Sequence, residues 1–238
     1  VDSAGIVRVE NADLSDTLVA IQHVNSETGV IQPVAAIGAA IRGAGGLWLC
    51  DCAQSAGKLA LPDADFIAIG AHKLGGPVGV GALLVRDLAT LHAVGGQELG
   101  YRGGTENLPA ILGMAAALEA PRAWQAEAEA LRARLDAAIV AMGGEIVSAT
   151  GPRIATIASY RMPGVSARAQ LIRFDGAGIA VSAGSACSSG TLKSSPVLAA
   201  MGWDAIAAGE VVRVSFGWTT TGQDVDGFIT QWRRIAAR

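Results

Sequence analysis

Four short apolar runs in the first ninety residues constrain the fold more than any other feature of this sequence. They are TLVAIQHV at 17–24, LWLCDCA at 47–53, ADFIAIGA at 64–71 and GVGALLVR at 79–86. Each has the length of a strand, and such nearly continuous apolar runs are typical of strands that are buried on both faces. The segment PVAAIGAAIRGAG at 33–45 separates the first two runs and opens with a proline that suits the first turn of a helix. We therefore predict an α/β fold with a mostly parallel sheet.

The second half of the chain has a different pattern. Residues 107–142 have a helical pattern that Pro121 interrupts. Beyond them we predict strands at 154–160, 179–183 and 211–216, and helices near 166–176, 195–201 and 222–236. We therefore predict two domains, residues 1–120 with the sheet and residues 121–238 as a smaller α+β domain.

Composition excludes several classes of function. The chain has 238 residues and a net charge of −3, which gives no electrostatic reason to bind nucleic acid or an anionic membrane. It contains no apolar run of membrane-spanning length and no signal peptide. Its three cysteines have no disulfide-type spacing, which indicates a reducing, cytoplasmic location. Cys50 and Cys52 lack further Cys or His neighbours, so we interpret them as buried core thiols and predict no metal site.

Two predicted strands end in residues that can carry chemistry. Asp51 ends the second run, and ligands of open α/β sheets bind beyond the carboxyl ends of strands. A carboxylate there can pair with a protonated ring nitrogen, although a capping or turn aspartate is the better explanation when this residue is taken alone. His72 and Lys73 follow the next run; a lysine in an apolar pocket can offer a neutral amine, and a histidine can move protons. Taken alone, an exposed Lys–His pair in a loop is the simpler interpretation.

Two loops add further candidates. GGQELGYRGGTEN at 95–107 is rich in glycine, and Gly103, Gly104 and Thr105 could present N–H groups and a hydroxyl to an anion. The alternative is an ordinary long loop. VSAGSACSSGTLKSS at 181–195 places Cys187 among small polar residues that cannot bury much surface. A cysteine on such a segment is expected to be exposed and mobile, which suits a nucleophile that has to reach its target.

These motifs together resemble one family. HVNSETGVIQPV, DCAQSAGK, GAHKLGGPVGVGALLVR, GGQELGYRGGTENLPAILG, VSAGSACSSG and VRVSFG occur in the order found in cysteine desulfurases of the class V aminotransferase superfamily. The SAGSAC form is similar to the iron–sulfur and nitrogen-fixation type with a long cysteine loop. The resemblance implies fold type I, with an incomplete large-domain sheet and a small C-terminal domain, and the cofactor pyridoxal 5'-phosphate (PLP).

The resemblance also implies a role for each candidate residue. Lys73 would bind the PLP aldehyde, Asp51 the pyridine nitrogen and Gln54 the phenolic oxygen. His72 would contact the cofactor phosphate, and Thr105 would reach the cofactor of a second subunit, which implies a homodimer. Arg213 would bind the carboxylate of L-cysteine, a task that suits a guanidinium group. Cys187 would take the sulfur as a persulfide, leaving L-alanine, and hand it to an acceptor protein for iron–sulfur cluster or thio-cofactor assembly.

The sequence departs from the family pattern in places. Ser26 stands where the family has an asparagine that contacts the cofactor, Gly70 replaces a serine, and Leu99 replaces an arginine. An N-terminal stretch with a phosphate-binding loop and a ring-stacking histidine has no counterpart, which predicts an unpaired sheet edge and exposed apolar surface. A PLP-dependent cysteine desulfurase is thus the main prediction, and a truncated, inactive remnant of the family is the alternative. The motifs do not separate cysteine from selenocysteine or cysteine sulfinate as substrate.

Overall fold

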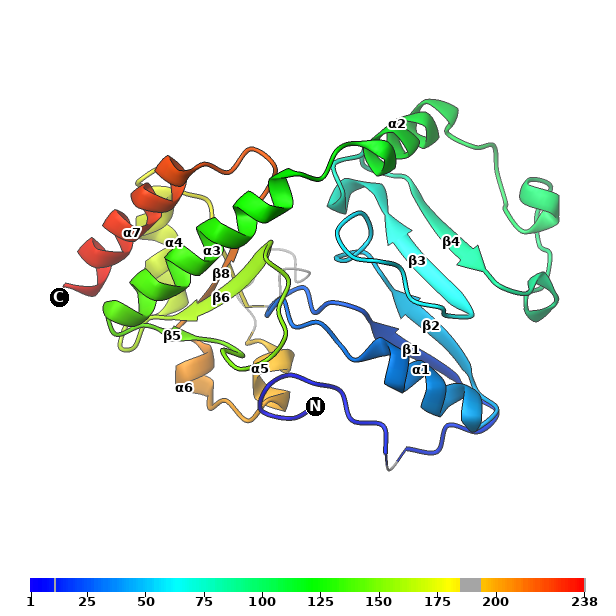
Figure 1. The fold of residues 1–238 in the computed structure, drawn as a ribbon, viewed down its shortest axis with the longest axis horizontal. Helices are drawn as coiled ribbons and strands as arrows, with labels where there is room; N and C mark the ends of the chain where they lie inside the picture. The colour runs from blue at the N-terminus through cyan, green and yellow to red at the C-terminus, as the bar shows by residue number, and fades with distance from the viewer. Residues whose placement is uncertain (11, 185–193, 238) are drawn as a thin grey trace. The chain divides into compact units, whose positions relative to one another are not determined.

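The computed structural model describes residues 1–10, 12–184 and 194–237, which pack as two units (Figure 1). The first unit comprises residues 9–24 and 33–122, and the second comprises 1–8, 25–32 and 123–238. These units record which described residues pack together. The division into domains at residues 120 and 121 stays a prediction.

A four-stranded sheet forms the centre of the first unit. Its strands are β1 (Leu18–Gln22), β2 (Leu47–Asp51), β3 (Phe66–Gly70) and β4 (Gly81–Val85), in the spatial order β1-β2-β3-β4. The first three strands are parallel, and helix α1 (Val34–Gly43) forms the crossover between β1 and β2. These elements lie within the ranges that the apolar runs predict.

Strand β4 runs antiparallel to β3. Residues 71–80, which connect the two strands, contain only the 3₁₀ turn η1 (Ala71–Lys73), and a parallel crossover needs a longer connection. Gly70 pairs with Gly81 at the start of β4, where a Cβ on Gly81 would lie 2.5 Å from the carbonyl oxygen of Ile69. Glycine at position 81 therefore permits the close approach of the two strands.

The two faces of this sheet differ in how they are covered. Helix α1 packs on the face of Trp48, which is 1% exposed; a Cβ on Gly38 of α1 would lie 2.4 Å from the indole. The opposite face, here named the Asp51 face, carries residues that share register across the strands. Its members include Leu18, Leu47, Asp51, Ala68 and Leu83. Leu18 is 57% exposed and Leu83 is 50% exposed, so much of this apolar face lies open in the described structure.

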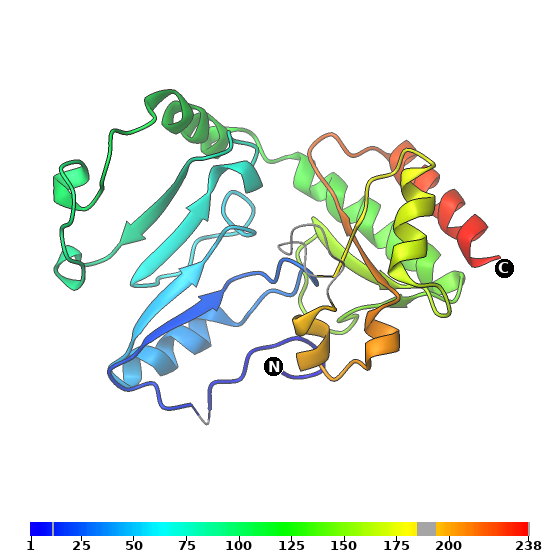
Figure 2. The ribbon, with the colours of Figure 1, turned by 180° about the vertical axis from the view of Figure 1, so that it is seen from behind.

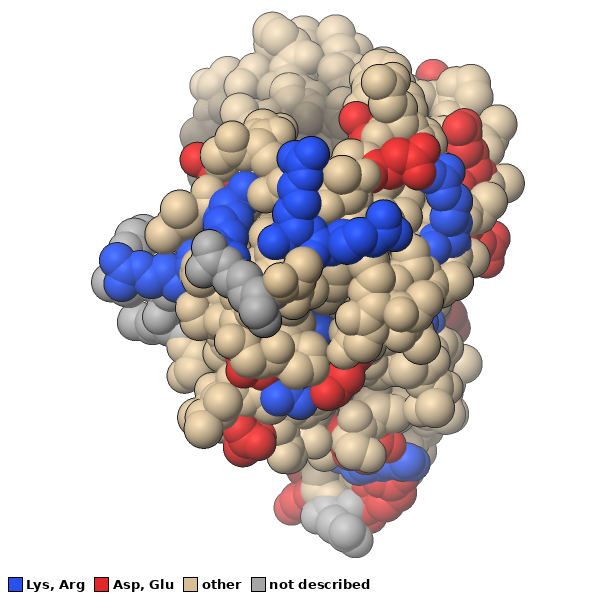
Figure 3. Space-filling view, turned by 90° about the vertical axis from the view of Figure 1, so that its left-hand side faces the viewer, with Lys and Arg blue, Asp and Glu red and all other residues tan. Residues whose placement is uncertain are grey.

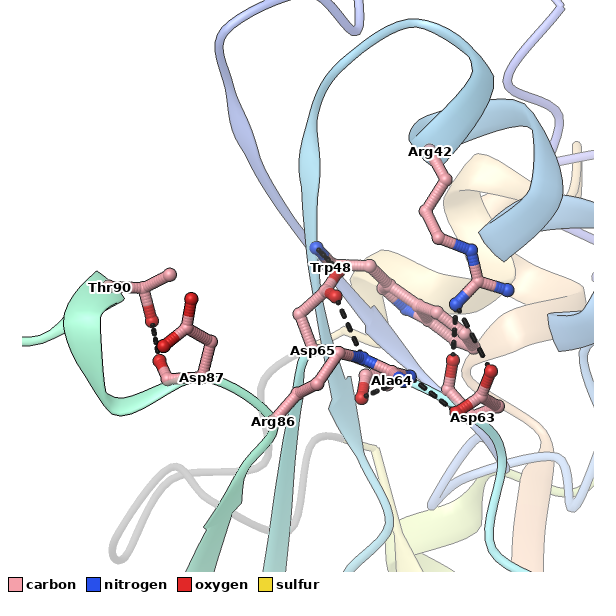
Figure 4. A network of polar contacts seen from close by, with 8 residues as sticks. All are labelled: Arg42, Trp48, Asp63, Ala64, Asp65, Arg86, Asp87 and Thr90. Atoms are coloured by element: carbon pink, nitrogen blue, oxygen red, sulfur yellow. Dashed lines mark hydrogen bonds and ion pairs between the residues drawn. The ribbon is translucent and has the colours of Figure 1, made fainter.

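A polar network fixes the sheet at the end opposite Asp51 (Figure 4). The side chain of Asp65 accepts from the backbone N–H of Trp48 at 2.9 Å and from Arg86 Nε at 3.2 Å. Arg86 also bonds the carboxylate of Asp63, and Arg42 of α1 donates to the carbonyl oxygen of Asp63 at 2.7 Å. This network links α1, β2, β3 and the end of β4.

The first unit continues beyond β4 through an extended segment, which Figure 2 shows from behind. The segment contains the 3₁₀ turns η2 (Leu88–Thr90) and η3 (Glu98–Gly100) and leads to helix α2 (Leu108–Glu119). Asn107 caps α2 by accepting from the backbone N–H of Ala110.

The second unit is built on an antiparallel sheet with the order β5-β6-β8-β7. Its strands are β5 (Glu145–Ile146), β6 (Ile157–Arg161), β7 (Ser182–Ala183) and β8 (Val211–Ser215). Its helices are α3 (Trp124–Ala141), α4 (Ala167–Asp175), α5 (Pro196–Ala200), α6 (Ala205–Ala208) and α7 (Gly222–Ala236). The sequence pattern predicted most of these elements but not β5 or α6, which are two and four residues long.

The core of the second unit is closed. Leu135 of α3, Tyr160 of β6, Phe174 of α4 and Trp232 of α7 are each at most 1% exposed. Phe174 stacks on Phe228 with ring centroids 4.6 Å apart. Helices α3, α4 and α7 thus supply a continuous apolar core over one face of the sheet.

A buried polar network lies beside this core. Asp136 of α3 accepts from the hydroxyl of Tyr160 at 2.7 Å and from Arg153 Nη2 at 3.1 Å, and it lies 3.7 Å from Arg132 Nε. Burial raises the pKa of Tyr160, and the negative charge of Asp136 adds to this effect. Burial also lowers the pKa of Arg132. The Asp136 carboxylate therefore compensates two largely buried guanidinium groups.

Residues 25–32 belong to the second unit although they follow β1 in the sequence. Ser159 Oγ donates to the carbonyl oxygen of Glu27 at 2.6 Å, and the backbone N–H of Ile154 donates to that of Gly29 at 2.8 Å. Gly29 has a φ of +75°, and a Cβ there would lie 2.5 Å from the carbonyl oxygen of Ile157. Glycine at this position lets the segment lie directly against β6.

The surface of the second unit carries a group of basic side chains on the face drawn in Figure 3. Arg173 lies in the last turn of α4, and Arg233 and Arg234 lie in the last turn of α7. Cations in these positions complement the partial negative charge at a helix C-terminus.

Among the residues that the structure describes, no helix is both long enough and apolar enough to cross a bilayer.

Candidate active site

Asp51 and the His72–Lys73 pair lie at one end of the first unit's sheet. Strands β2 and β3 are parallel and paired, so Asp51 at the end of β2 lies at the same edge as Gly70 at the end of β3. The side chain of Asp51 is exposed, and its Oδ1 accepts from the backbone N–H of Ala53 at 2.8 Å. The carboxylate thus begins the turn that follows β2 and remains accessible on the Asp51 face.

The turn at residues 52–59 places Gln54 next to Asp51. Two backbone hydrogen bonds of 2.8 Å hold this turn. The N–H of Ala56 donates to the carbonyl oxygen of Cys52, and the N–H of Leu59 donates to the carbonyl oxygen of Ser55. The N–H of Cys52 donates to Ala68 of β3 at 2.9 Å, which ties the turn to the next strand. Gln54 is half-buried in this turn.

Lys73 ends the 3₁₀ turn η1 directly after β3. The turn is anchored by a bond from the N–H of Ala71 to Val80 at 3.1 Å and by one from the N–H of Leu74 to Ala71 at 3.0 Å. His72 and Lys73 are both exposed. A Cβ on Gly70 would meet the imidazole of His72 at 3.5 Å, an ordinary contact, so a hydroxyl-bearing residue would fit sterically there.

The lysine that is desolvated in this unit is Lys58, not Lys73. Lys58 is half-buried, and its Nζ donates to the carbonyl oxygen of Lys73 at 2.9 Å and to that of Gln54 at 3.1 Å. Burial, together with the charge of Lys73, lowers the pKa of Lys58 to about 8. Sequence reasoning missed this residue, because nothing in DCAQSAGK indicates that its last side chain contacts the backbone of Lys73.

Cys50 and Cys52 lie on the covered face of the sheet, opposite Asp51. Both side chains are 0% exposed, which confirms the prediction of buried core thiols. Their sulfur atoms are 3.7 Å apart, and the thiol of Cys52 donates to the sulfur atom of Cys50. No group of three metal-ligating side chains occurs in the described ranges.

The loop that carries Thr105 is closed at its base by two backbone bonds between Gln97 and Arg102, each 3.1 Å long. Gly103, Gly104 and Thr105 follow this closed turn and are all exposed. Leu99 lies in the turn with a φ of 58° and is 88% exposed. The loop therefore presents Thr105 and its neighbouring glycines to the exterior.

Arg213 and Ser26 belong to the second unit. Arg213 lies on β8, and its Nη1 donates to the carbonyl oxygen of Ser26 at 2.8 Å while its Nη2 donates to Ser182 Oγ at 3.2 Å. Its Nε is buried and has no partner in the described structure. An unpaired guanidinium N–H of this kind can donate to an anionic ligand such as a carboxylate. Cys187 lies outside the described residues.

The ring-binding half of the donor set fits PLP. A carboxylate, an amide side chain and a primary amine lie on the ends of two adjacent strands, beside an open apolar face that a planar ring can cover. For the phosphate, the same edge offers His72, while Gly70 contributes no hydroxyl. Asp51 would therefore hold the protonated ring nitrogen and Lys73 the aldehyde carbon.

Comparisons with known proteins identify the family of the chain. The aminotransferase class-V family model matches residues 10–228. The cysteine desulfurase IscS of an Anaeromyxobacter species is 39% identical over 241 residues, which cover 92% of this chain and 58% of that relative. The chain thus spans less than two thirds of the length of the curated relative.

Solved structures give the same result. The NifS-like protein of Rickettsia africae superposes with a TM-score of 0.87 at 28% identity, covering 100% of this chain and 69% of that one. A structure described as SspA in complex with cysteine has a TM-score of 0.74 at 28% identity, covering 90% of this chain and 64% of that one. The predicted α/β architecture of PLP-dependent fold type I is confirmed, and members of this family depend on PLP. This chain belongs to the class V aminotransferases and is similar to their cysteine desulfurases.

Proposed function

We propose that this chain carries the PLP-binding and sulfur-transfer residues of a cysteine desulfurase, which converts L-cysteine to L-alanine. The observation that carries the proposal is the placement of Asp51 and Lys73 at adjacent carboxyl ends of parallel strands, within a chain of this family. Similarity to curated cysteine desulfurases, and to a solved structure described as SspA in complex with cysteine, supports L-cysteine as the substrate.

The residues of the first unit would orient the cofactor. Lys73 would hold the aldehyde carbon through its amine, and Asp51 would keep the proton on the pyridine nitrogen. Gln54 would donate to the phenolic oxygen and His72 would contact the phosphate; PLP, when bound there, would supply an electron sink.

The residues of the second unit would act on the substrate. Arg213 would bind the carboxylate of L-cysteine, since its guanidinium group has one buried N–H without a partner in the described structure. Ser26, whose carbonyl oxygen accepts from Arg213, would add a hydroxyl group beside it. The thiolate of Cys187 attacks the substrate sulfur, so that an S–S bond forms as the substrate C–S bond breaks. The substrate carbon then takes up a proton, which leaves L-alanine and a persulfide on Cys187.

The proposal extends to partners. Thr105 lies exposed beside two glycines, which suits a contact with the cofactor phosphate of a second copy, and we propose a homodimer. An acceptor protein would take the persulfide sulfur for iron–sulfur cluster or thio-cofactor assembly. The free thiols of Cys50 and Cys52 support a reducing, cytoplasmic location.

The test is the visible absorbance of the chain after incubation with PLP, compared with that of Lys73→Ala. We expect a band from the lysine-bound cofactor in the native chain and none in the variant. A band of equal intensity in Lys73→Ala would overturn the assignment of Lys73.

A second measurement separates cofactor binding from sulfur transfer. The Cys187→Ser variant should keep the absorbance band and lose sulfide production from L-cysteine, because only the sulfur nucleophile is removed. Sulfide production equal to that of the native chain would exclude Cys187 as the acceptor. A band without any sulfide production by the native chain would favour an inactive relative that retains the cofactor site.

A further inference from the structure

Lys58 connects two segments that carry the proposed cofactor ligands. Its Nζ bonds the carbonyl oxygen of Gln54 at 3.1 Å and that of Lys73 at 2.9 Å. Gln54 lies in the turn after β2, whereas Lys73 lies in the turn after β3. One ammonium group therefore joins the two turns at the carboxyl end of the sheet.

The packing of the turn supports this connection. Gly57, next to Lys58, has a φ of +76°, and a Cβ there would lie 3.3 Å from Cβ of Leu74. The backbone N–H of Lys58 donates to the carbonyl oxygen of Ser55 at 2.8 Å, so the backbone of Lys58 is part of the hydrogen-bonded turn. The turn thus packs against Leu74, the residue after Lys73. This packing brings Lys58 close enough for its ammonium group to bond the carbonyl oxygen of Lys73.

The ammonium group of Lys58 is partly desolvated where it makes these two bonds. Desolvation is the largest cause of the lowered pKa of Lys58, and the charge of Lys73 is the second. An ammonium group is costly to desolvate unless its donors are used, and here two of them are directed at carbonyl oxygens. The contact also places a second positive charge near the amine of Lys73.

We propose that Lys58 is a positioning residue that holds the backbone of Lys73 in register with Gln54 and thereby aims the Lys73 amine at the ring site. Its action on PLP rests on the proposed function above. Its action on the backbone does not, because it concerns the cofactor-free chain.

The first experiment measures amide hydrogen exchange in the cofactor-free chain. The N–H groups of Leu74 and Gly76 both donate to the carbonyl oxygen of Ala71, at 3.0 and 2.9 Å, and report on the turn that carries Lys73. In Lys58→Met their exchange should be about tenfold faster, which corresponds to losing one hydrogen bond from a charged donor. Lys58→Arg keeps the charge and the donors and should restore slow exchange.

Arg42→Met provides the matched control. Arg42 is also a cation that donates to a backbone carbonyl in this unit, at 2.7 Å to Asp63, but it lies at the opposite end of the sheet (Figure 4). This variant should leave exchange at Leu74 and Gly76 unchanged. Equal acceleration in both lysine variants, or the same acceleration in Arg42→Met, would overturn the proposal.

The second experiment measures the dissociation constant of PLP by the visible band. It should rise about tenfold in Lys58→Met and return toward the native value in Lys58→Arg. Unchanged PLP affinity in Lys58→Met would show that Lys58 does not position the Lys73 amine for the cofactor. Absence of a band in the native chain would count against the proposed function, and the exchange measurement would then still decide whether Lys58 fixes the turn.

Discussion

The two sheets of this molecule differ in how completely their faces are covered. In the second unit, helices α3, α4 and α7 cover one face of the antiparallel sheet, and Tyr160, Phe174 and Trp232 are each 0% exposed. In the first unit, α1 covers the face of Trp48, while Leu18, Leu47 and Leu83 on the Asp51 face are exposed. The residues proposed to bind the PLP ring lie at the end of the incompletely covered sheet.

This difference separates two uses of buried surface. The closed sheet derives stability from apolar contacts that exclude water. The Asp51 face keeps apolar area available for a flat ligand or for further polypeptide, and it leaves Asp51 and Lys73 accessible. The stability of the chain and its proposed binding of the PLP ring therefore depend mainly on different sheets.

The largest test of the comparison uses one substitution at two places. Leu135→Ala in the closed core should lower the free energy of unfolding by about 3 kcal/mol, because it leaves a cavity. Leu83→Ala on the Asp51 face should change it by about 0.5 kcal/mol or less, because the side chain is half exposed. Urea unfolding of both variants measures the difference. Equal losses would mean that the Asp51 face is buried in solution, and the comparison would fail.

A second test concerns the ionic networks of the two units. Asp136→Asn should lower the free energy of unfolding by about 3 kcal/mol, because Arg132 and Arg153 would keep buried charges without a counterion. Asp63→Asn in the exposed network of Figure 4 should have a much smaller effect, because water screens its ion pairs. Thermal unfolding of the two variants tests this order. A larger loss of stability for Asp63→Asn would mean that the exposed network contributes more to stability than the buried one.

The smallest expected effect sharpens the comparison through pH. The pKa of Lys58 is lowered from its usual 10.5 to about 8, so between these values the unfolded chain binds the proton that the folded chain has released. The free energy of unfolding of the native chain should therefore rise with pH in this range, relative to Lys58→Met, by at most about 3 kcal/mol, and by less to the extent that water screens this half-buried group. Below pH 8 the difference should be constant. Urea unfolding of both proteins across the range measures it, and parallel pH profiles would show that Lys58 is not desolvated.

Much of the fold follows from local sequence patterns. Apolar runs of strand length indicated β1 to β4, and Pro33 with the following small residues indicated α1. The direction of β4 did not follow, since it depends on the connection at 71–80 being too short for a crossover. The very short β5 and α6 offered no periodicity to detect.

The candidate site was predictable in part. The ends of the apolar runs indicated Asp51 and Lys73, because strand ends collect ligand-binding residues in parallel sheets. Lys58 was not predictable, because its contact with Lys73 depends on the packing of Gly57 against Leu74, which is a tertiary event. The exposure of Lys73 could not be predicted either, since an apolar strand before a lysine does not indicate which other residues cover the end of that strand.

The order of strands in the two sheets has a consequence for how the chain folds. In the first unit, sequential strands are also spatial neighbours, so the ends that carry Asp51 and Lys73 form through contacts of modest sequence separation. In the second unit, Arg213 of β8 bonds Ser26, which is 187 positions away in the sequence and therefore closes a long loop. Contacts of low sequence separation form quickly, whereas long loop closures are slow. During synthesis, the strand ends that carry Asp51 and Lys73 should thus assemble while the arginine that would bind the substrate is still to be translated.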